Sequence, residues 1–296
     1  MKKTKLIGIL ICLSLLFAFP LTSSLDNKKI EKRYQDENSL KISLDFPPKW
    51  NVGDYWVYDL NMETSIEEWF PVSLQGSIED LNFSVGDVSY DSYTLNLEGK
   101  LKGRFDAILH IKPIPFNLRV LGWLRRTSID GSIFLTKEGW GLKEIYLHLH
   151  GKARLLSLPL PIFAPIPFDA TLKIIFNSPC FLFGFSKMEV GEYWIIPTPK
   201  FSLYATISLF FGIIGKPFSS EDLSPPNWVD VYTECVAKEN VTVPSGTYEA
   251  YKIWAEEGGI VEYYYAPQVN NIIKLKTNEE LDYFHLNVEL KSTSYG

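Results

Sequence analysis

The sequence predicts a mainly β protein with little helix, built from two tandem antiparallel modules. Two observations carry this prediction: polar and apolar residues alternate in many segments, and one short motif occurs twice. Alternation is plain at 95–101, 145–150, 251–255 and 284–290. Period-two patterning bounded by Gly, Asn, Asp and Pro is typical of half-buried strands. Long stretches of helical periodicity are nearly absent.

The repeated motif is Val-Gly-Asp-Tyr-Trp at 52–56, which returns as Val-Gly-Glu-Tyr-Trp at 190–194. A weaker second match relates 90–95 to 248–253. We expect each copy to begin the first strand of its module: the glycine turns the chain, the acid stays solvated and the tryptophan anchors the core. The alternative is an aromatic platform for a ligand.

These repeats divide the chain into a first β module at 46–187 and a second at 188–296. Residues 25–45 are rich in Lys, Glu, Asp and Asn and form a polar leader. Asp-Gly within 127–132 and Pro-Ser-Gly within 243–247 predict tight turns. Prolines in 113–118 and 165–170 predict irregular connections between strands.

The first 24 residues have the pattern of a signal peptide. They contain no acid, and an apolar stretch at 6–21 lies between an N-terminal group of lysines and the small residues at 22–24. That order of charge, apolar core and small residues is typical of a secretory signal. We therefore expect a secreted or cell-surface protein. The alternative is that the segment is retained as an anchor.

Composition and motifs exclude several function classes. The formal net charge is −6 and no long basic cluster is present, so nucleic acid is not an expected partner. No G-x-S-x-G, phosphate-binding loop, dinucleotide fingerprint, H-E-x-x-H or C-x-x-C occurs. We expect no enzyme activity, no catalytic residue and no cofactor. A hydrolase built on carboxylates that converge in space is the remaining catalytic alternative.

Four residues are candidates for covalent modification. Cys180 and Cys235 remain after removal of a signal peptide, and an exported chain allows a disulfide between them. The alternative is that Cys235, in an alternating segment, is a buried strand thiol. Asn82 and Asn240 each begin an N-x-S/T sequon and are candidate glycosylation sites.

His148 and His150 lie two residues apart in an alternating segment, so their side chains share one face of a strand. Such a pair binds zinc if a third ligand joins it. The alternative is a pair of histidines on the polar face. The sequence supplies no spacing that identifies a third ligand, and we predict no metal site from it.

Further motifs carry a family resemblance. With the two copies of the repeated motif, the segments 243–253 (VPSGTYEAYKI), 263–267 (YYYAP) and 272–274 (IIK) resemble a group of secreted archaeal and bacterial proteins. Their modules are similar to Lol-type lipoprotein carriers and mycobacterial lipid-binding lipoproteins. The resemblance is best over 188–296 and weaker over 50–150, and the chain departs from lipid-anchored members in lacking a clear lipobox. It implies that each module is a curved sheet, a half-barrel, whose concave face holds a lipid or acyl chain.

Two apolar segments agree with lipid contact. Residues 155–168 and 202–215 contain no charged residue, and neither segment is long enough to span a bilayer. Apolar loops cover a ligand groove, contact a membrane, or plug their own barrel or module interface. As a lid over an apolar ligand we single out Leu160, Phe163, Phe168, Leu209, Phe210 and Phe211.

The expected function is therefore non-catalytic: a binding protein of the cell envelope or extracellular space that holds a lipid or other apolar ligand. The expected partners are a lipid or a membrane surface; no protein partner is indicated. The alternative is a structural or adhesive surface protein whose barrels are filled by their own side chains.

Overall fold

The computed structural model describes ten segments of the chain: 49–66, 72–110, 117–158, 165–181, 188–196, 200–209, 214–223, 231–255, 261–277 and 284–295. The signal peptide at 1–24 and the polar leader at 25–45 lie outside these residues.

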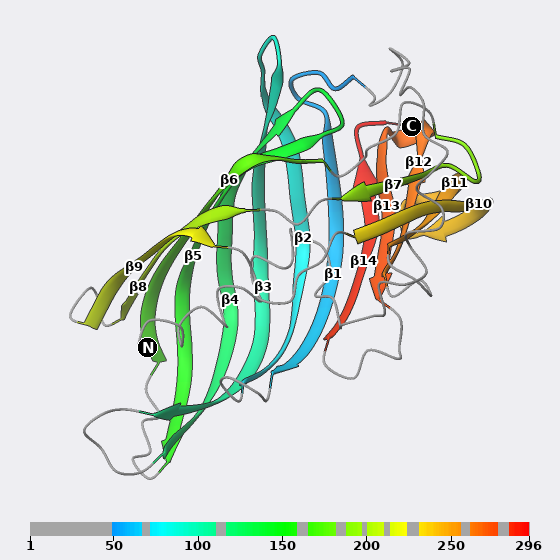
Figure 1. Cartoon of the computed structure of the whole chain (residues 1–296). Coiled ribbons are helices and arrows are strands. Elements are labelled where there is room, and N and C mark those ends of the chain that lie inside the picture. The colour runs from blue at the N-terminus through cyan, green and yellow to red at the C-terminus, as the bar shows by residue number, and fades with distance from the viewer. Residues whose placement is uncertain are drawn as a thin grey trace, which may run out of the picture.

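The described residues form fourteen strands and one 3-10 turn (Figure 1). The strands are β1 (Tyr55–Ile66), β2 (Val72–Val88), β3 (Ser92–His110), β4 (Asn117–Thr136), β5 (Gly141–Leu158), β6 (Pro165–Phe181), β7 (Tyr193–Ile196), β8 (Phe201–Leu209), β9 (Ile214–Leu223), β10 (Val231–Val243), β11 (Gly246–Ala255), β12 (Val261–Ala266), β13 (Asn271–Thr277) and β14 (Phe284–Thr293). The 3-10 turn is η2 (Pro267–Val269). All strand pairs are antiparallel, which confirms the predicted mainly β class with little helix.

The strands of both predicted segments join in a single sheet. Its order is β7-β10-β11-β12-β13-β14-β1-β2-β3-β4-β5-β6-β8-β9. The two segments meet where β1 pairs with β14, with Tyr58 opposite Leu290. The chain also crosses from β6 to β7 and returns to β8, so β8 and β9 extend the side of the sheet that β1–β6 begin. The sequence indicated two curved sheets because local patterns do not show which distant strands become neighbours.

Figure 1 shows the sheet as a curved trough whose two edges, β8–β9 and β7–β10, bend toward the viewer. Strands β2–β6 are its longest elements, with 17 to 20 residues each. Tight turns join β2 to β3 and β4 to β5 at the upper end of the view, and β3 and β5 run from there to the lower end. The trough therefore has two different ends, one closed by short turns and one where the longer connections attach.

The two faces of the sheet differ in chemistry. One face, here the inner face, carries a continuous cluster of buried apolar side chains. At its centre lie Ile78, Leu97, Ile129, Leu147 and Leu172, one from each of β2–β6, with exposures of 0 or 1%.

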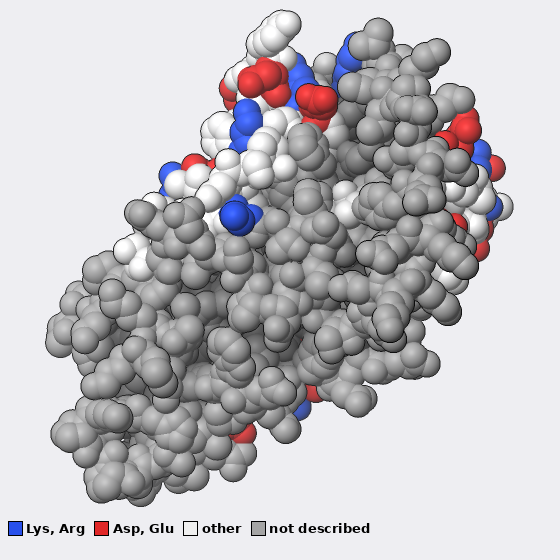
Figure 2. All heavy atoms as spheres, viewed as in Figure 1, with Lys and Arg blue, Asp and Glu red and all other residues white. Residues whose placement is uncertain are grey.

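The opposite, outer face carries ion pairs between neighbouring strands, such as Lys102–Glu79 at 2.6 Å and Lys173–Glu144 at 2.9 Å. In Figure 2, acidic and basic side chains of the described residues mix along the upper rim of the molecule. Exposed pairs of this kind contribute little to stability, so the buried apolar face is what holds the sheet together.

The repeated motif has the same geometry in both copies. Gly53 and Gly191 adopt φ of +93° and +94°, a conformation that favours glycine. Their amides donate to the carbonyls of Val85 and Cys235 at 2.9 and 2.7 Å. The amides of Val85 and Cys235 in turn donate to the carbonyl of the motif's acidic residue, at 2.8 Å in each copy. The repeat is therefore one turn structure used twice in the same sheet.

The tryptophans of the first copy anchor the core, as the sequence predicted. The indole of Trp56 donates to the Val269 carbonyl at 2.8 Å, and that of Trp50 donates to the Asn270 carbonyl at 3.0 Å. Trp50 also packs on Trp140, with ring centroids 4.4 Å apart. These contacts attach the start of the chain's first strand to the 3-10 turn of the C-terminal part.

Two local predictions were wrong. The Asp-Gly pair at 130–131 lies inside β4 and makes no turn, because Gly131 is needed for close strand approach: a Cβ there would lie 2.1 Å from the Tyr146 carbonyl oxygen. The prolines at 165 and 167 begin β6 instead of interrupting it. Proline has no N–H to donate, and both prolines lie where β6 pairs only with β5, since pairing with β8 starts at Phe168; no bond to β8 is therefore lost at either position. The turn at 243–247 is confirmed by the β10–β11 hairpin.

Candidate functional site

The inner face of the trough is the first candidate site. From β1 to β8 in the sheet order, the buried side chains that the structure describes on this face are aliphatic or aromatic, apart from Thr127. Thr127 is 0% exposed, and its hydroxyl has no hydrogen-bond partner within the described part of the chain. A buried hydroxyl without a partner costs about 1–3 kcal/mol. It is also a ready donor for the polar group of a bound molecule.

The strand registers bring the apolar connections to one end of the trough. His110 pairs with Asn117, and Arg154 pairs with Pro165, so the connections 111–116 and 159–164 leave the same end of β3–β6. Leu209 pairs with both Phe168 and Ile214, so β8 ends and β9 begins beside the first residues of β6. The sequences of these connections are IKPIPF, PLPIFA and FFGI. The strand ends that flank these three apolar sequences thus lie at the end of the trough opposite the short turns.

The structure describes only two of the six proposed lid residues. Phe168 lies in β6, is half-buried and packs against the core. Leu209 ends β8 directly opposite Phe168. Leu160, Phe163, Phe210 and Phe211 lie outside the described residues. The structure therefore brings the two predicted apolar segments together through Phe168 and Leu209, and the role of a lid stays a prediction.

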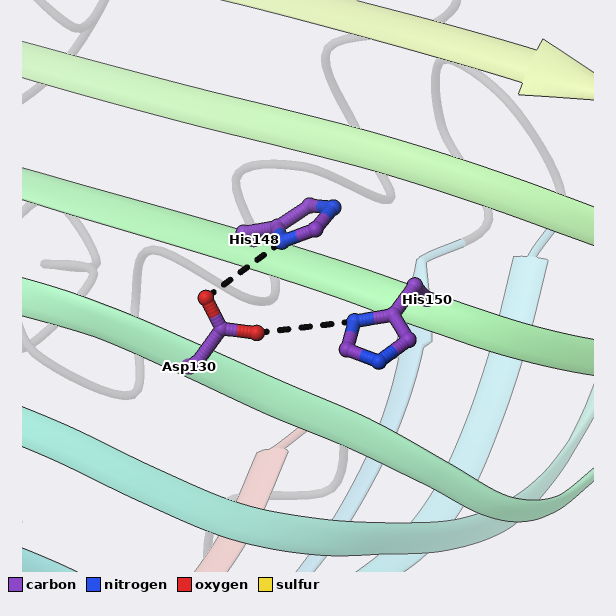
Figure 3. Close-up of side chains that lie close together, drawn as sticks. All are labelled: Asp130, His148 and His150. Atoms are coloured by element: carbon purple, nitrogen blue, oxygen red, sulfur yellow. Dashed lines mark hydrogen bonds and ion pairs between the residues drawn. The ribbon is translucent and has the colours of Figure 1, made fainter.

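A second candidate site is a cluster of histidine and aspartate side chains on the outer face (Figure 3). His148 and His150 come from β5 and Asp130 from β4, where it pairs directly with His148. His148 Nδ1 lies 3.3 Å from Asp130 Oδ2, and His150 Nδ1 lies 3.5 Å from Asp130 Oδ1. The two imidazole rings stack with centroids 4.9 Å apart. One ligand atom from each of the three residues fits within a set no more than 4.8 Å apart.

A fourth residue, Asp169 of β6, approaches His148 from the other side of its ring. Asp169 Oδ2 lies 2.8 Å from His148 Nε2. The hydrogen bond to Asp169 and the charge of Asp130 raise the pKa of His148 above its usual value, against partial burial that lowers it. Sequence reasoning identified the histidine pair but missed both aspartates, since each reaches the pair only through strand register.

Cys235 is a free, buried thiol, the second of the two alternatives that the sequence left open. It lies in β10 opposite Ile253 and is 0% exposed. Burial raises the pKa of this thiol to about 11, so it is a poor nucleophile at neutral pH. Cys180 belongs to β6, which pairs with β5 and β8, and its side chain lies outside the described residues.

The two sequons differ in accessibility. Asn240 is exposed in β10, where it pairs with Glu249 of the β10–β11 hairpin. Asn82 is half-buried in β2 between β1 and β3, and its buried Oδ1 has no hydrogen-bond partner among the residues that the structure describes. Glycosylation stays a prediction for both residues, with Asn240 the accessible one.

Comparison with known proteins identifies no relative: no protein-family model, no curated protein and no solved structure matches the chain. Among the described residues, no helix is long and apolar enough to cross a membrane. Function must therefore be argued from the two faces of the sheet.

Proposed function

We propose that the chain is a non-catalytic binding protein of the cell envelope or extracellular space that holds a mainly apolar ligand, such as a lipid acyl chain, on the inner face of the trough. The observation that carries the proposal is the inner face itself. Its apolar side chains run without a break across neighbouring strands 17 to 20 residues long. Binding sites for apolar molecules have this composition, with a few placed polar groups that fix orientation.

Two further features support this proposal. Thr127 places a buried hydroxyl on β4 of the apolar face, and this hydroxyl has no hydrogen-bond partner among the residues that the structure describes. The apolar connections 111–116, 159–164 and 210–213 attach at one end of the trough, where an apolar ligand entering from a membrane would first make contact. The expected export signal at 1–24 is consistent with work at the envelope.

The second candidate is a structural or adhesive surface protein whose trough is filled by its own side chains. The observation that favours it is that the chain's own atoms already bury the inner face: Leu97, Leu147 and Leu172 are each 0% exposed. Both candidates need the same apolar face, and they differ in whether a ligand can share it.

Native mass spectrometry of the mature protein from its own cells, followed by solvent extraction and lipid analysis, separates the two. The ligand proposal expects a stoichiometric lipid, and a stripped protein that takes up a fluorescent fatty acid in competition with unlabelled lipid. A clean apo mass with no uptake of fatty acid or phospholipid contradicts it and leaves the structural protein. Uptake by heat-denatured protein serves as the control for non-specific adsorption.

A further inference from the structure

We infer that Asp130, His148 and His150 form a binding site for a divalent transition-metal ion of the zinc type on the outer face of the sheet. The inference rests on the ligand set, its spacing and the group that orients it. It does not depend on the apolar ligand, which would occupy the opposite face.

The ligand set comes from two neighbouring strands. Successive residues of a strand point to opposite faces, so His148 and His150 share the outer face, while Leu147 and Leu149 are buried on the inner one. Asp130 is the direct cross-strand partner of His148. Figure 3 shows its carboxylate lying between the two rings, with one oxygen toward each.

The spacing is close to that of a bound ion. Zinc binds imidazole nitrogen and carboxylate oxygen at about 2.0–2.2 Å, so tetrahedral ligand atoms lie roughly 3.3–3.6 Å apart. Each histidine nitrogen lies at about this separation from one oxygen of Asp130: His148 Nδ1 is 3.3 Å from Oδ2, and His150 Nδ1 is 3.5 Å from Oδ1. All three ligand atoms lie within 4.8 Å of one another. Small rotations of these partly exposed side chains, which move their ligand atoms by about 1.5 Å, would therefore bring the three atoms around an ion.

Asp169 orients the central ligand. It accepts a hydrogen bond from His148 Nε2 at 2.8 Å, which keeps the proton of a neutral imidazole on Nε2. The lone pair is then on Nδ1, the atom that faces Asp130. Metal-binding histidines commonly donate their other N–H to a carboxylate in this way, and loss of that carboxylate weakens metal binding about 10- to 100-fold. Asp169 is thus a positioning residue.

The environment decides which ion fits. Two imidazoles and one carboxylate favour zinc and similar transition metals, whereas calcium and magnesium require a shell of oxygen ligands. The His148, His150 and Asp130 side chains are 26, 49 and 46% exposed, so solvent can reach the ion and fill the remaining positions.

The test is isothermal titration of Zn²⁺ into the full chain, purified without a histidine tag and stripped with a chelator. We expect one ion per chain, binding that Ca²⁺ and Mg²⁺ do not displace, and a Co²⁺ absorption spectrum of a four-coordinate N/O site. His150→Gln and Asp130→Asn should each abolish this one-to-one binding. Asp169→Asn, which leaves all three ligands in place, should weaken it about 10- to 100-fold.

The matched control is His285→Gln, a partly exposed histidine on β14 opposite Glu63, which should bind Zn²⁺ as the wild type does. Thermal melts in chelator establish that every variant is folded before titration. The inference is overturned if the wild type binds no Zn²⁺, or if His150→Gln and Asp130→Asn bind it with unchanged affinity. Equal loss in His285→Gln would also overturn it, because the ion would then bind elsewhere.

Discussion

The hydroxyl of Thr127 allows a sharp test of the inner face. Thr127→Val replaces this hydroxyl by a methyl group of nearly the same size. The hydroxyl is fully buried and makes no hydrogen bond within the described residues, so the unliganded protein carries its desolvation cost. We expect the substitution to stabilise the apo protein by about 1–2 kcal/mol, which corresponds to a rise of roughly 2–8 °C in Tm for a chain of this size.

The same substitution should act in the opposite direction on ligand binding. If the hydroxyl binds the polar group of an apolar ligand, its loss removes one neutral hydrogen bond, worth about 0.5–1.5 kcal/mol or roughly a two- to tenfold rise in Kd. Differential scanning calorimetry of stripped protein and displacement of a fluorescent fatty acid measure the two effects.

Thr233→Val is the matched control. Thr233 is also 0% exposed, and its hydroxyl has no hydrogen-bond partner in the described part of the chain. It lies in β10, between β7 and β11, far from β4 in the sheet order. Thr233→Val should raise Tm without changing the Kd for the fatty acid. A lower Tm for Thr127→Val would refute the claim that its hydroxyl lacks a partner, and a higher Tm with unchanged Kd would refute its role as an anchor.

Three further predictions concern other parts of the molecule. Because the pKa of His148 is raised above 6.5, its protonated form stabilises the fold fully below pH 6.5, and this stability is lost as pH rises through the folded pKa. Thermal melts of chelator-treated protein should show this loss, and His148→Gln should remove the pH dependence. Cys235 should resist iodoacetamide at pH 8 in the native protein and react at once in denaturant; rapid native labelling would contradict its burial. Gly53→Ala and Gly191→Ala place a side chain at φ of +93° and +94° with open space around it, so each should lower the free energy of unfolding by about 1–2 kcal/mol through backbone strain alone. The two losses, measured by urea unfolding, should add. A neutral result at either site would show that the turn can change conformation.

The repeated motif shows what the sequence can predict. Val-Gly-Asp/Glu-Tyr-Trp encodes a complete local structure: a glycine at positive φ, an acid at the turn and a tryptophan that begins a strand. Alternation within β5 predicted equally well which side chains are buried, because only neighbours along one strand decide the pattern. Both are short-range signals, and both were read correctly.

The pairing of strands that are distant in the sequence could not be predicted. The pairing of β14 with β1 joins the two ends of the described chain, and no local pattern identifies which distant strands become neighbours. The third metal ligand was missed for a related reason. Asp130 precedes Gly131, and Asp-Gly is a strong turn signal. Because Gly131 has no side chain, the Tyr146 carbonyl can approach it closely, and the aspartate remains in β4 opposite His148.

The two sites proposed for this chain use opposite faces of the same strand. In β5, Leu147 and Leu149 face the apolar trough, while His148 and His150 face the aspartates outside. A substitution that replaces only a surface ligand leaves the inner packing untouched, so His150→Gln should lose the metal and keep fatty-acid binding. Thr127→Val should keep the metal and weaken fatty-acid binding about two- to tenfold. Because no shared side chain links the two measurements, either activity can fail without weakening the case for the other. If His150→Gln instead changed fatty-acid binding, the ion would have to act on the geometry of β5 itself. The outer cluster would then be a regulator of the trough, and not an independent site.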